Sequence, residues 1–191
     1  FTCLNNHINS TGIILYVSRI DTGKGWDVLL NAVSELKLKG GIAGKRILFV
    51  GYGEQIELLK ERIKERDLSD CCYYLGPKTH QELNELYNQA DIMIFPTMLY
   101  ESLGLVGIEA MACGCPVIGS NIGCLPEYIK DGITGFLFES GNSHKLAEKI
   151  IDFYKLTEKQ KETMRLQSIK AVCQYDSDEI SRKLINKMKE I

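Results

Sequence analysis

Two glutamates eight positions apart are the side chains of this sequence whose surroundings point most clearly to chemistry. Glu109 is the only charged residue between Ser102 and Pro126, and apolar residues flank it at helical spacing. An ionised carboxylate buried without partners is costly, so Glu109 would need strong donors there. A carboxylate can accept both hydroxyls of a vicinal diol, as acidic residues do with ribose in α/β folds. The structural alternative is a Glu109 that reaches solvent or is satisfied by nearby backbone amides.

Glu101 precedes the same expected helix and follows an expected strand that ends at Phe95. It should therefore lie in a loop at the carboxyl edge of a parallel sheet, where open α/β folds bind ligands. Gly104 allows a close turn, and the free amides of Leu105 and Val106 at the helix N-terminus would suit a phosphate. An exposed loop glutamate beside a flexible glycine is the alternative.

Two cations flank the first expected strand-to-helix turn. Arg19 follows the strand that ends at Val17, and Lys24 stands between Gly23 and Gly25 just before a helix. An arginine fork and a lysine point charge at a helix N-terminus can neutralise a diphosphate. Taken singly, each is equally well read as an ordinary surface cation.

Short β-branched runs alternate with helical periodicities. The six expected strands are Ile13 to Val17, Arg46 to Val50, Tyr73 to Leu75, Ile92 to Phe95, Pro116 to Ile118 and Gly135 to Phe138. Helices are expected over residues 26–36, 56–63 and 143–156, from capping boxes at Thr79 and Thr157, near Glu109, and over 178–189. The pattern predicts a Rossmann-like three-layer α/β domain with about six parallel strands.

Length and net charge limit the number of domains and the classes of binding partner that we expect. The 191 residues predict a single domain over 1–191, with residues 157–191 as a helical C-terminal extension. A net charge of −2, with 23 basic and 25 acidic residues, gives no electrostatic case for nucleic acid or an anionic lipid surface. Any bound phosphate must therefore be held by a few placed cations.

The seven cysteines lack the paired spacing of a zinc site. Cys113, Cys115 and Cys124 form the one arguable cluster, and no histidine lies near it in the sequence. We therefore expect a reduced, cytoplasmic protein without a metal. The chain begins at Phe1 and shows no secretory pattern, so we expect a fragment of a longer protein.

Gly51-Tyr52-Gly53 follows the second expected strand and partly matches the dinucleotide fingerprint. Ile56 stands where the third glycine would fall, and Asp70 is the nearest acidic candidate for an adenosine ribose. The NAD hypothesis is weak, although the glycines would permit a ligand to approach the backbone closely.

A set of motifs in fixed order extends from about Ile13 to about Tyr154. It comprises Ser18-Arg19 with Lys24-Gly25, Val50-Gly51-Tyr52-Gly53, Leu75-Gly76, Ala90-Asp91 leading into Pro96, the run from Glu101 to Ala112, and Gly114-x-Pro116-Val117. Together these motifs resemble the C-terminal domain of the family 4 glycosyltransferases, whose E-x7-E motif is matched by Glu101 and Glu109. Ser102 and Leu103 depart from the Gly-Phe common in that motif, and Gly23 departs from the usual acidic residue or proline.

The resemblance implies half of a GT-B enzyme that transfers a sugar with retention, without an essential metal or cofactor, from a UDP- or GDP-linked donor. Arg19 and Lys24 resemble the cations on the donor diphosphate, Glu109 the ribose ligand, and Glu101 the catalytic carboxylate that positions the transferred sugar. Leu103, Gly104, Leu105 and Val106 would complete the donor site, and the loop containing Lys78 is similar to the one that lines the base.

A glycan or lipid acceptor would bind through the missing N-terminal domain, so the fragment should bind donor without efficient transfer. No membrane contact is expected from the fragment, while peripheral association of the full-length protein with the inner membrane stays open. Two alternatives also stay open. One is a nucleotide-sugar epimerase or glycosyl phosphorylase on the same fold, and the other is a noncatalytic nucleotide-binding module.

Overall fold

The structure, a computed structural model, describes residues 1–4 and 10–175. Its six strands form one parallel sheet in the order β3-β2-β1-β4-β5-β6. The strands are β1 (Ile13–Val17), β2 (Arg46–Val50), β3 (Cys72–Tyr74), β4 (Ile92–Phe95), β5 (Val117–Ser120) and β6 (Gly135–Phe138). This confirms the predicted Rossmann-like α/β fold. Only β3 and β5 differ from their expected bounds, by one or two residues at each end.

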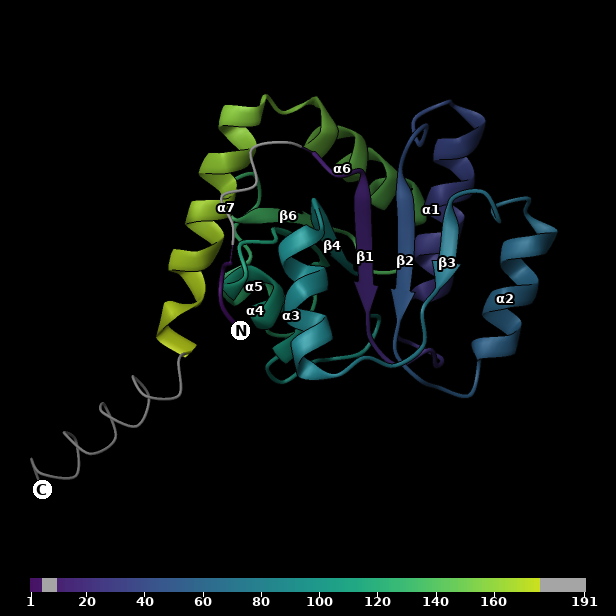
Figure 1. Cartoon of the computed structure of the whole chain (residues 1–191), viewed down its shortest axis with the longest axis horizontal. Helices are drawn as coiled ribbons and strands as arrows, with labels where there is room; N and C mark the ends of the chain where they lie inside the picture. The colour runs from purple at the N-terminus through teal and green to yellow at the C-terminus, as the bar shows by residue number, and fades with distance from the viewer. Residues whose placement is uncertain (5–9, 176–191) are drawn as a thin grey trace, which may run out of the picture.

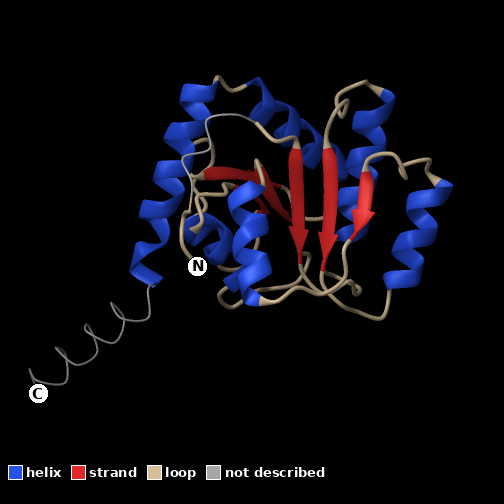
Figure 2. Ribbon diagram, viewed as in Figure 1, coloured by secondary structure: helices blue, strands red, loops and turns tan. Residues whose placement is uncertain are grey.

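The apolar character of the strands follows from helices on both faces of the sheet (Figure 2). Along β1, Ile14 and Tyr16 enter a core shared with helices α1 (Trp26–Leu38) and α6 (Ser143–Lys155). Leu15 and its neighbours on alternate positions enter a second core, shared with helix α4 (Leu105–Ala112). Because both faces are covered, alternation of apolar and polar residues disappears from the strand sequence.

The remaining helices begin where their capping residues predict. Thr79 and Glu82 form a capping box at the start of α3 (His80–Gln89), and Thr157 and Gln160 form another at α7 (Glu158–Val172). The other elements are α2 (Ile56–Glu65), α5 (Leu125–Tyr128) and the 3-10 turn η1 (Cys173–Tyr175). Sequence periodicity missed α5 because four residues make about one turn. The helix expected over 178–189 lies outside the described residues.

Helix α7 is part of the folded domain. It packs against α4, and Met164 and Ser168 are buried. The Ser168 hydroxyl donates to the backbone oxygen of Thr134 at 2.7 Å, which ties α7 to the turn before β6. Met164 belongs to the first core and Val172 to the second, so α7 contributes to both.

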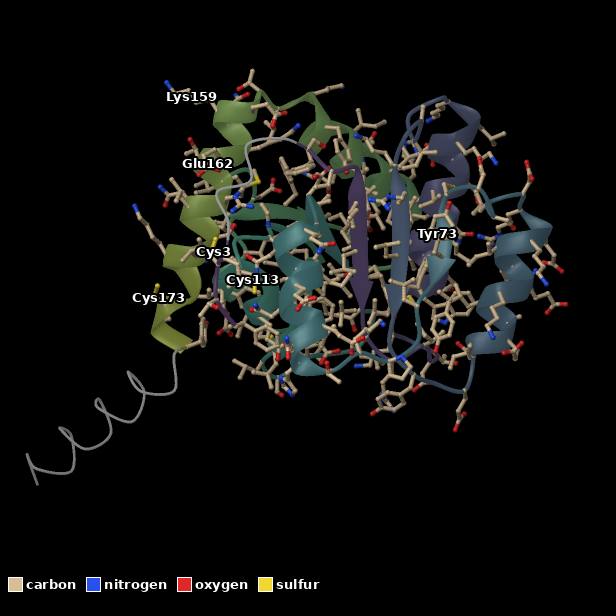
Figure 3. All side chains as sticks on the ribbon, viewed as in Figure 1. Cys3, Tyr73, Cys113, Lys159, Glu162 and Cys173 are labelled. Atoms are coloured by element: carbon tan, nitrogen blue, oxygen red, sulfur yellow. The ribbon has the colours of Figure 1, made fainter. Side chains whose placement is uncertain are left out.

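The charge-rich stretch 158–165 is typical of the solvated face of a helix, yet two of its cations are largely buried. The side chains of Lys161 and Arg165 are 14% and 12% exposed. The ammonium of Lys161 lies over the rings of Phe153 and Tyr154, which cover it. Lys159 lies on the same helix with its side chain directed outward (Figure 3).

The strand order reverses beside β1. The chain runs outward from β1 to β3 and then returns to place β4 against the other edge of β1. Figure 1 shows the carboxyl ends of β1, β2 and β3 at one edge of the molecule, where their loops gather. Loops that diverge at such a switch point leave the crevice in which open α/β sheets bind ligands. Among the described residues, no helix is long and apolar enough to cross a membrane.

Candidate anion and sugar site at the switch point

The loop after β1, which carries both predicted cations, is fixed by the neighbouring loop after β2. The Ile20 amide donates to the Tyr52 oxygen at 2.7 Å, and the Gln55 amide donates back to the Ile20 oxygen at 2.9 Å. The indole of Trp26, in the first turn of α1, donates to the Gln55 side-chain oxygen at 2.9 Å. The loops after β1 and β2 therefore hold each other in a fixed conformation.

Glycines make this close packing possible. Gly25 has φ 74°, and a Cβ at that position would lie 1.9 Å from the Pro96 oxygen. At Gly51 a Cβ would lie 1.9 Å from the Ser18 oxygen. Gly51 was expected to admit a ligand, but the structure uses its missing side chain to admit the backbone of the adjacent loop.

Tyr16 contacts the loop after β1 that carries Arg19 and Lys24, which we call the cation loop. Its ring is fully buried in the core, and its hydroxyl lies 3.0 Å from the Arg19 oxygen and 3.2 Å from the Lys24 oxygen. Burial raises the pKa of this phenol, which keeps the hydroxyl a donor. Tyr16 was not singled out from the sequence, because within an apolar strand a tyrosine looks like any other core residue.

Lys24 and Glu101 meet across the switch point. Lys24 Nζ lies 2.8 Å from Glu101 Oε1, and their side chains are 15% and 20% exposed. The Thr97 hydroxyl lies 3.2 Å from the same carboxylate oxygen. A lysine from the loop after β1 and a carboxylate from the loop after β4 thus form one partly buried charged pair.

The N-terminus of α4 opens beside this pair. Gly104 caps the helix with φ 65°, and its carbonyl accepts from the Tyr128 hydroxyl at 3.2 Å. A Cβ on Gly104 would lie 2.8 Å from that hydroxyl oxygen, so the close contact requires glycine. The amides of Leu105 and Val106 lie in the first turn, where no preceding turn supplies carbonyl partners. Such amides suit an anion.

Glu109 lies one turn further along α4 and is half-buried. The Tyr87 hydroxyl, from α3, donates to Glu109 Oε2 at 3.3 Å. Burial raises the pKa of the Glu109 carboxyl, and the Tyr87 hydrogen bond opposes part of that rise. The carboxylate thus has a side-chain donor, and Val106, three residues earlier, lines the cavity that the other predicted residues share.

A cavity of about 530 Å³ joins the loops after β1, β2, β3 and β4. It brings together eight of the predicted residues: Arg19, Lys24, Lys78, Glu101, Leu103, Gly104, Leu105 and Val106. Glu109 is the ninth, and it is not among the lining residues. Two of the lining cations pair with carboxylates outside the lining, Arg19 with Asp21 at 3.1 Å and Lys78 with Glu82 at 2.9 Å. Each cation therefore has a carboxylate that an incoming anion can replace.

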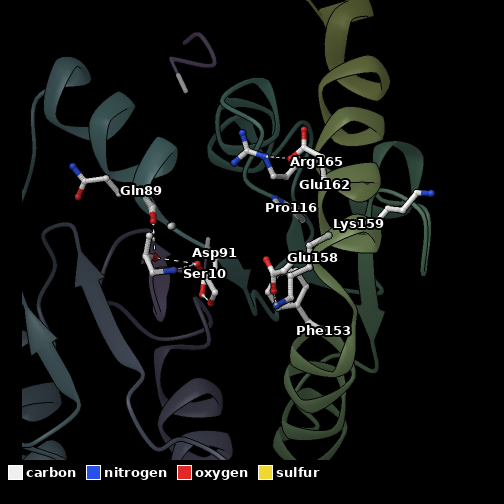
Figure 4. Close-up of a pocket in the computed structure, with 12 residues that line it drawn as sticks. Ser10, Gln89, Asp91, Pro116, Phe153, Glu158, Lys159, Glu162 and Arg165 are labelled. Atoms are coloured by element: carbon white, nitrogen blue, oxygen red, sulfur yellow. Dashed lines mark hydrogen bonds and ion pairs between the residues drawn. The ribbon is translucent and has the colours of Figure 1, made fainter. Parts of the chain in front are cut away.

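A second cavity, of about 260 Å³, lies at the opposite edge of the sheet (Figure 4). Asp91 there accepts from the Ser10 hydroxyl and from the Gly12 amide at 2.9 Å. Helix α7 contributes Glu158, Glu162, Lys159, Lys161 and Arg165 to its lining. Its three acids and three cations balance, and it lies at the amino ends of the strands. The candidate site is therefore the larger cavity at the carboxyl edge.

The cysteines give no metal centre in the described part of the chain, where no group of three or more histidine, cysteine, aspartate or glutamate side chains could hold an ion. Cys113 and Cys115 are buried, and burial raises the pKa of the Cys113 thiol to about 12. Both thiols lie in the second core, where that of Cys113 donates to Asn84 Oδ1 at 3.3 Å.

The fold and site define a Rossmann-like domain with a cationic cavity at its switch point. The profile of the family described as "Glycosyl transferases group 1" matches residues 5–167. The chain belongs to this family.

Two curated relatives show the same kinship. The amylovoran biosynthesis glycosyltransferase AmsK of Erwinia amylovora is 34% identical over 139 residues, which cover 70% of this chain and 34% of AmsK. The D-inositol 3-phosphate glycosyltransferase of Corynebacterium jeikeium is 33% identical over 145 residues, covering 73% of this chain and 34% of that protein. The chain thus spans about a third of the length of these relatives.

The fold is shared with solved protein structures. The complex of Anabaena HepE with UDP and glucose superposes with a TM-score of 0.83 over 96% of this chain and 50% of that one, at 22% identity. At that identity the likeness establishes the fold.

Proposed function

We propose that this chain is the donor-binding half of a retaining glycosyltransferase and that its switch-point cavity holds the diphosphate of a nucleotide sugar. The observation that carries the proposal is the meeting of Lys24 and Glu101 beside the first turn of α4, within one cavity. A cation and a helix N-terminus favour an anion, and a carboxylate at the same place favours sugar hydroxyls.

Transfer breaks the bond between the anomeric carbon and the diphosphate oxygen. The acceptor hydroxyl oxygen forms the new bond on the same face of the sugar and gives its proton to the departing diphosphate. The bonding electrons leave with the diphosphate, which gains negative charge. Lys24, Arg19 and the amides of Leu105 and Val106 would stabilise that charge, which is often the largest contribution to such catalysis. Glu101 would orient the sugar, and Glu109 would accept the ribose hydroxyls. In this proposal the two cations and the helix amides supply the positive charge that balances the diphosphate, so the transfer needs no metal ion.

The relatives suggest the substrate class. HepE was solved with UDP and glucose, and AmsK is named for the biosynthesis of amylovoran. We therefore propose a UDP-linked hexose as donor and a growing saccharide as acceptor, which the remainder of the full-length protein would bind.

Calorimetric titration of the chain with UDP tests donor binding. Lys24→Ala should weaken UDP binding roughly ten- to 100-fold, the scale of a lost charge-assisted hydrogen bond. Lys60→Ala, which removes an exposed cation of α2, is the matched control and should bind as the parent does. A parent chain that binds neither UDP nor GDP at millimolar concentration would overturn the proposal.

Assays of the full-length protein test the chemistry. The expected product keeps the donor's anomeric configuration, and it should form equally well in EDTA. Lys24→Ala should lower the rate of sugar transfer strongly and change the melting temperature little. An epimerised nucleotide sugar, or a sugar phosphate formed from free phosphate, would instead assign the same cavity to an epimerase or a phosphorylase.

A further inference from the structure

We propose that Tyr52 is the platform on which the base of the bound nucleotide stacks. This inference rests on the proposed function and adds the recognition of the nucleoside. Tyr52 lines the switch-point cavity, yet its side chain is 64% exposed. Other aromatic residues near the sheet, such as Tyr16 and Phe49, are fully buried. A large ring left open at the wall of a cationic cavity offers a face to a ligand.

The direction of the ligand follows from the order of the strands. Lys24 and the first turn of α4 place the diphosphate over the adjacent ends of β1 and β4. Glu101 places the sugar on the β4 side of that point. From there the lining continues over the loops after β2 and β3, with Tyr52, Pro77 and Lys78. The nucleoside, at the other end of the diphosphate from the sugar, therefore extends toward Tyr52.

The backbone holds Tyr52 in place without using its ring. Its carbonyl accepts from the Ile20 amide at 2.7 Å. The preceding Gly51 carbonyl accepts from the Tyr74 hydroxyl at 2.8 Å, and the Gly51 amide donates to the Gly76 oxygen at 3.1 Å. These bonds join the loops after β1, β2 and β3, so the ring is presented from a fixed main chain. Such preorganisation lowers the entropy lost when a base stacks.

Stacking needs a ring face and tolerates any base, because every base has a π surface. Tyr52 should therefore strengthen binding of UDP and GDP alike and contribute nothing to binding of inorganic diphosphate. The phenylalanine variant keeps the ring, and the alanine variant removes it. Neither substitution touches the main-chain bonds, so both variants should fold.

The test measures the affinity of the 191-residue chain for UDP, GDP and inorganic diphosphate by calorimetry. Tyr52→Ala should weaken UDP and GDP roughly tenfold or more and leave diphosphate within about twofold of the parent. Tyr52→Phe should bind all three as the parent does. The control is Tyr73→Ala, which removes a partly exposed tyrosine of β3 outside the cavity and should change none of the affinities (Figure 3).

The outcomes separate this inference from the proposed function. Unchanged UDP binding by Tyr52→Ala, with UDP binding still lost in Lys24→Ala, overturns the stacking role and leaves the donor site standing. An equal loss of UDP and diphosphate binding in Tyr52→Ala also overturns it, because the residue then supports the loop rather than the base. A parent chain that binds neither UDP nor GDP overturns both proposals.

Discussion

Lys24 and Glu101, from loops on opposite sides of the switch point, lie 2.8 Å apart at Nζ and Oε1. Each is partly buried, and each neutralises the other. Under the proposed function, a diphosphate would compete with Glu101 for the lysine, and the displaced carboxylate would become available to the sugar. Occupation of the anion site and readiness of the sugar site would then be coupled through this one pair.

That coupling predicts opposite effects of Glu101→Gln on binding and on transfer. The amide removes the competing charge, so UDP should bind about two- to tenfold more tightly to the chain. Transfer by the full-length protein should fall by about 100-fold or more, because the carboxylate that orients the sugar is gone. Calorimetry and an initial-rate assay measure the two. A variant that binds UDP no better than the parent would contradict the competition.

The burial of Glu109 predicts that removing its charge stabilises the fold and weakens UDP binding. Burial raises the pKa of its carboxyl above the usual 4.5, so the folded chain retains the proton to higher pH than the unfolded chain. The contribution of Glu109 to the free energy of unfolding therefore falls as pH rises from about 4.5 through its folded pKa, and it is constant above that.

Glu109→Gln lacks this titration. It should melt a few degrees above the parent at pH 7 and together with it at pH 4, while UDP binding weakens because the ribose loses a carboxylate. Thermal scans at the two pH values and a titration check this. Glu61→Gln, on the exposed face of α2, is the control and should match the parent in all three measurements. A Glu109→Gln variant less stable than the parent at pH 7 would contradict the sign.

Gly25→Ala should prevent stable folding of the cation loop. The new Cβ would lie 1.9 Å from the Pro96 oxygen, and the backbone conformation is left-handed. We expect a loss of about 3 kcal/mol or more in the free energy of unfolding, measured in urea. Gly40→Ala has the same handedness and nothing within 4 Å, so it isolates the backbone cost of about 1 kcal/mol. Equal losses in both variants would show that crowding at Pro96 is unimportant.

Tyr16→Phe should weaken both the domain and the site. It removes the hydroxyl beneath the Arg19 and Lys24 carbonyls, which should lower the free energy of unfolding by about 1 kcal/mol. UDP affinity should fall severalfold, because the loop loses its support. Tyr154→Phe removes a hydroxyl that donates to Asp91 at the opposite edge of the sheet. It should lower the free energy of unfolding and leave UDP affinity unchanged. If Tyr16→Phe binds UDP as tightly as the parent does, the Tyr16 hydroxyl does not contribute to the nucleotide site.

Much of the fold follows from local patterns. The run from Ile13 to Val17 is apolar at every position, which is enough to indicate a strand covered on both faces. Thr79 and Glu82 mark a helix start because both halves of a capping box lie within four residues. The contacts involved are close in sequence, so residue type and spacing determine them.

Tertiary structure alone decided the rest. Nothing in the sequence indicates that Tyr16 supports the cation loop or that Gly51 admits the backbone of Ser18, because these contacts join segments that meet only when the sheet forms. The burial of Arg165, within a stretch that looks solvated, likewise depends on where α7 packs.

The sequence by itself determined the strands, most of the helices and the residues that were candidates for an anion site. Only the folded chain decided that Lys24 and Glu101, separated by 77 positions, lie within hydrogen-bonding distance. The physical reason is the order of the strands. A run of apolar residues indicates that a strand is covered on both faces, while the return of β4 to the side of β1 depends on packing between helices and sheet that no local pattern encodes.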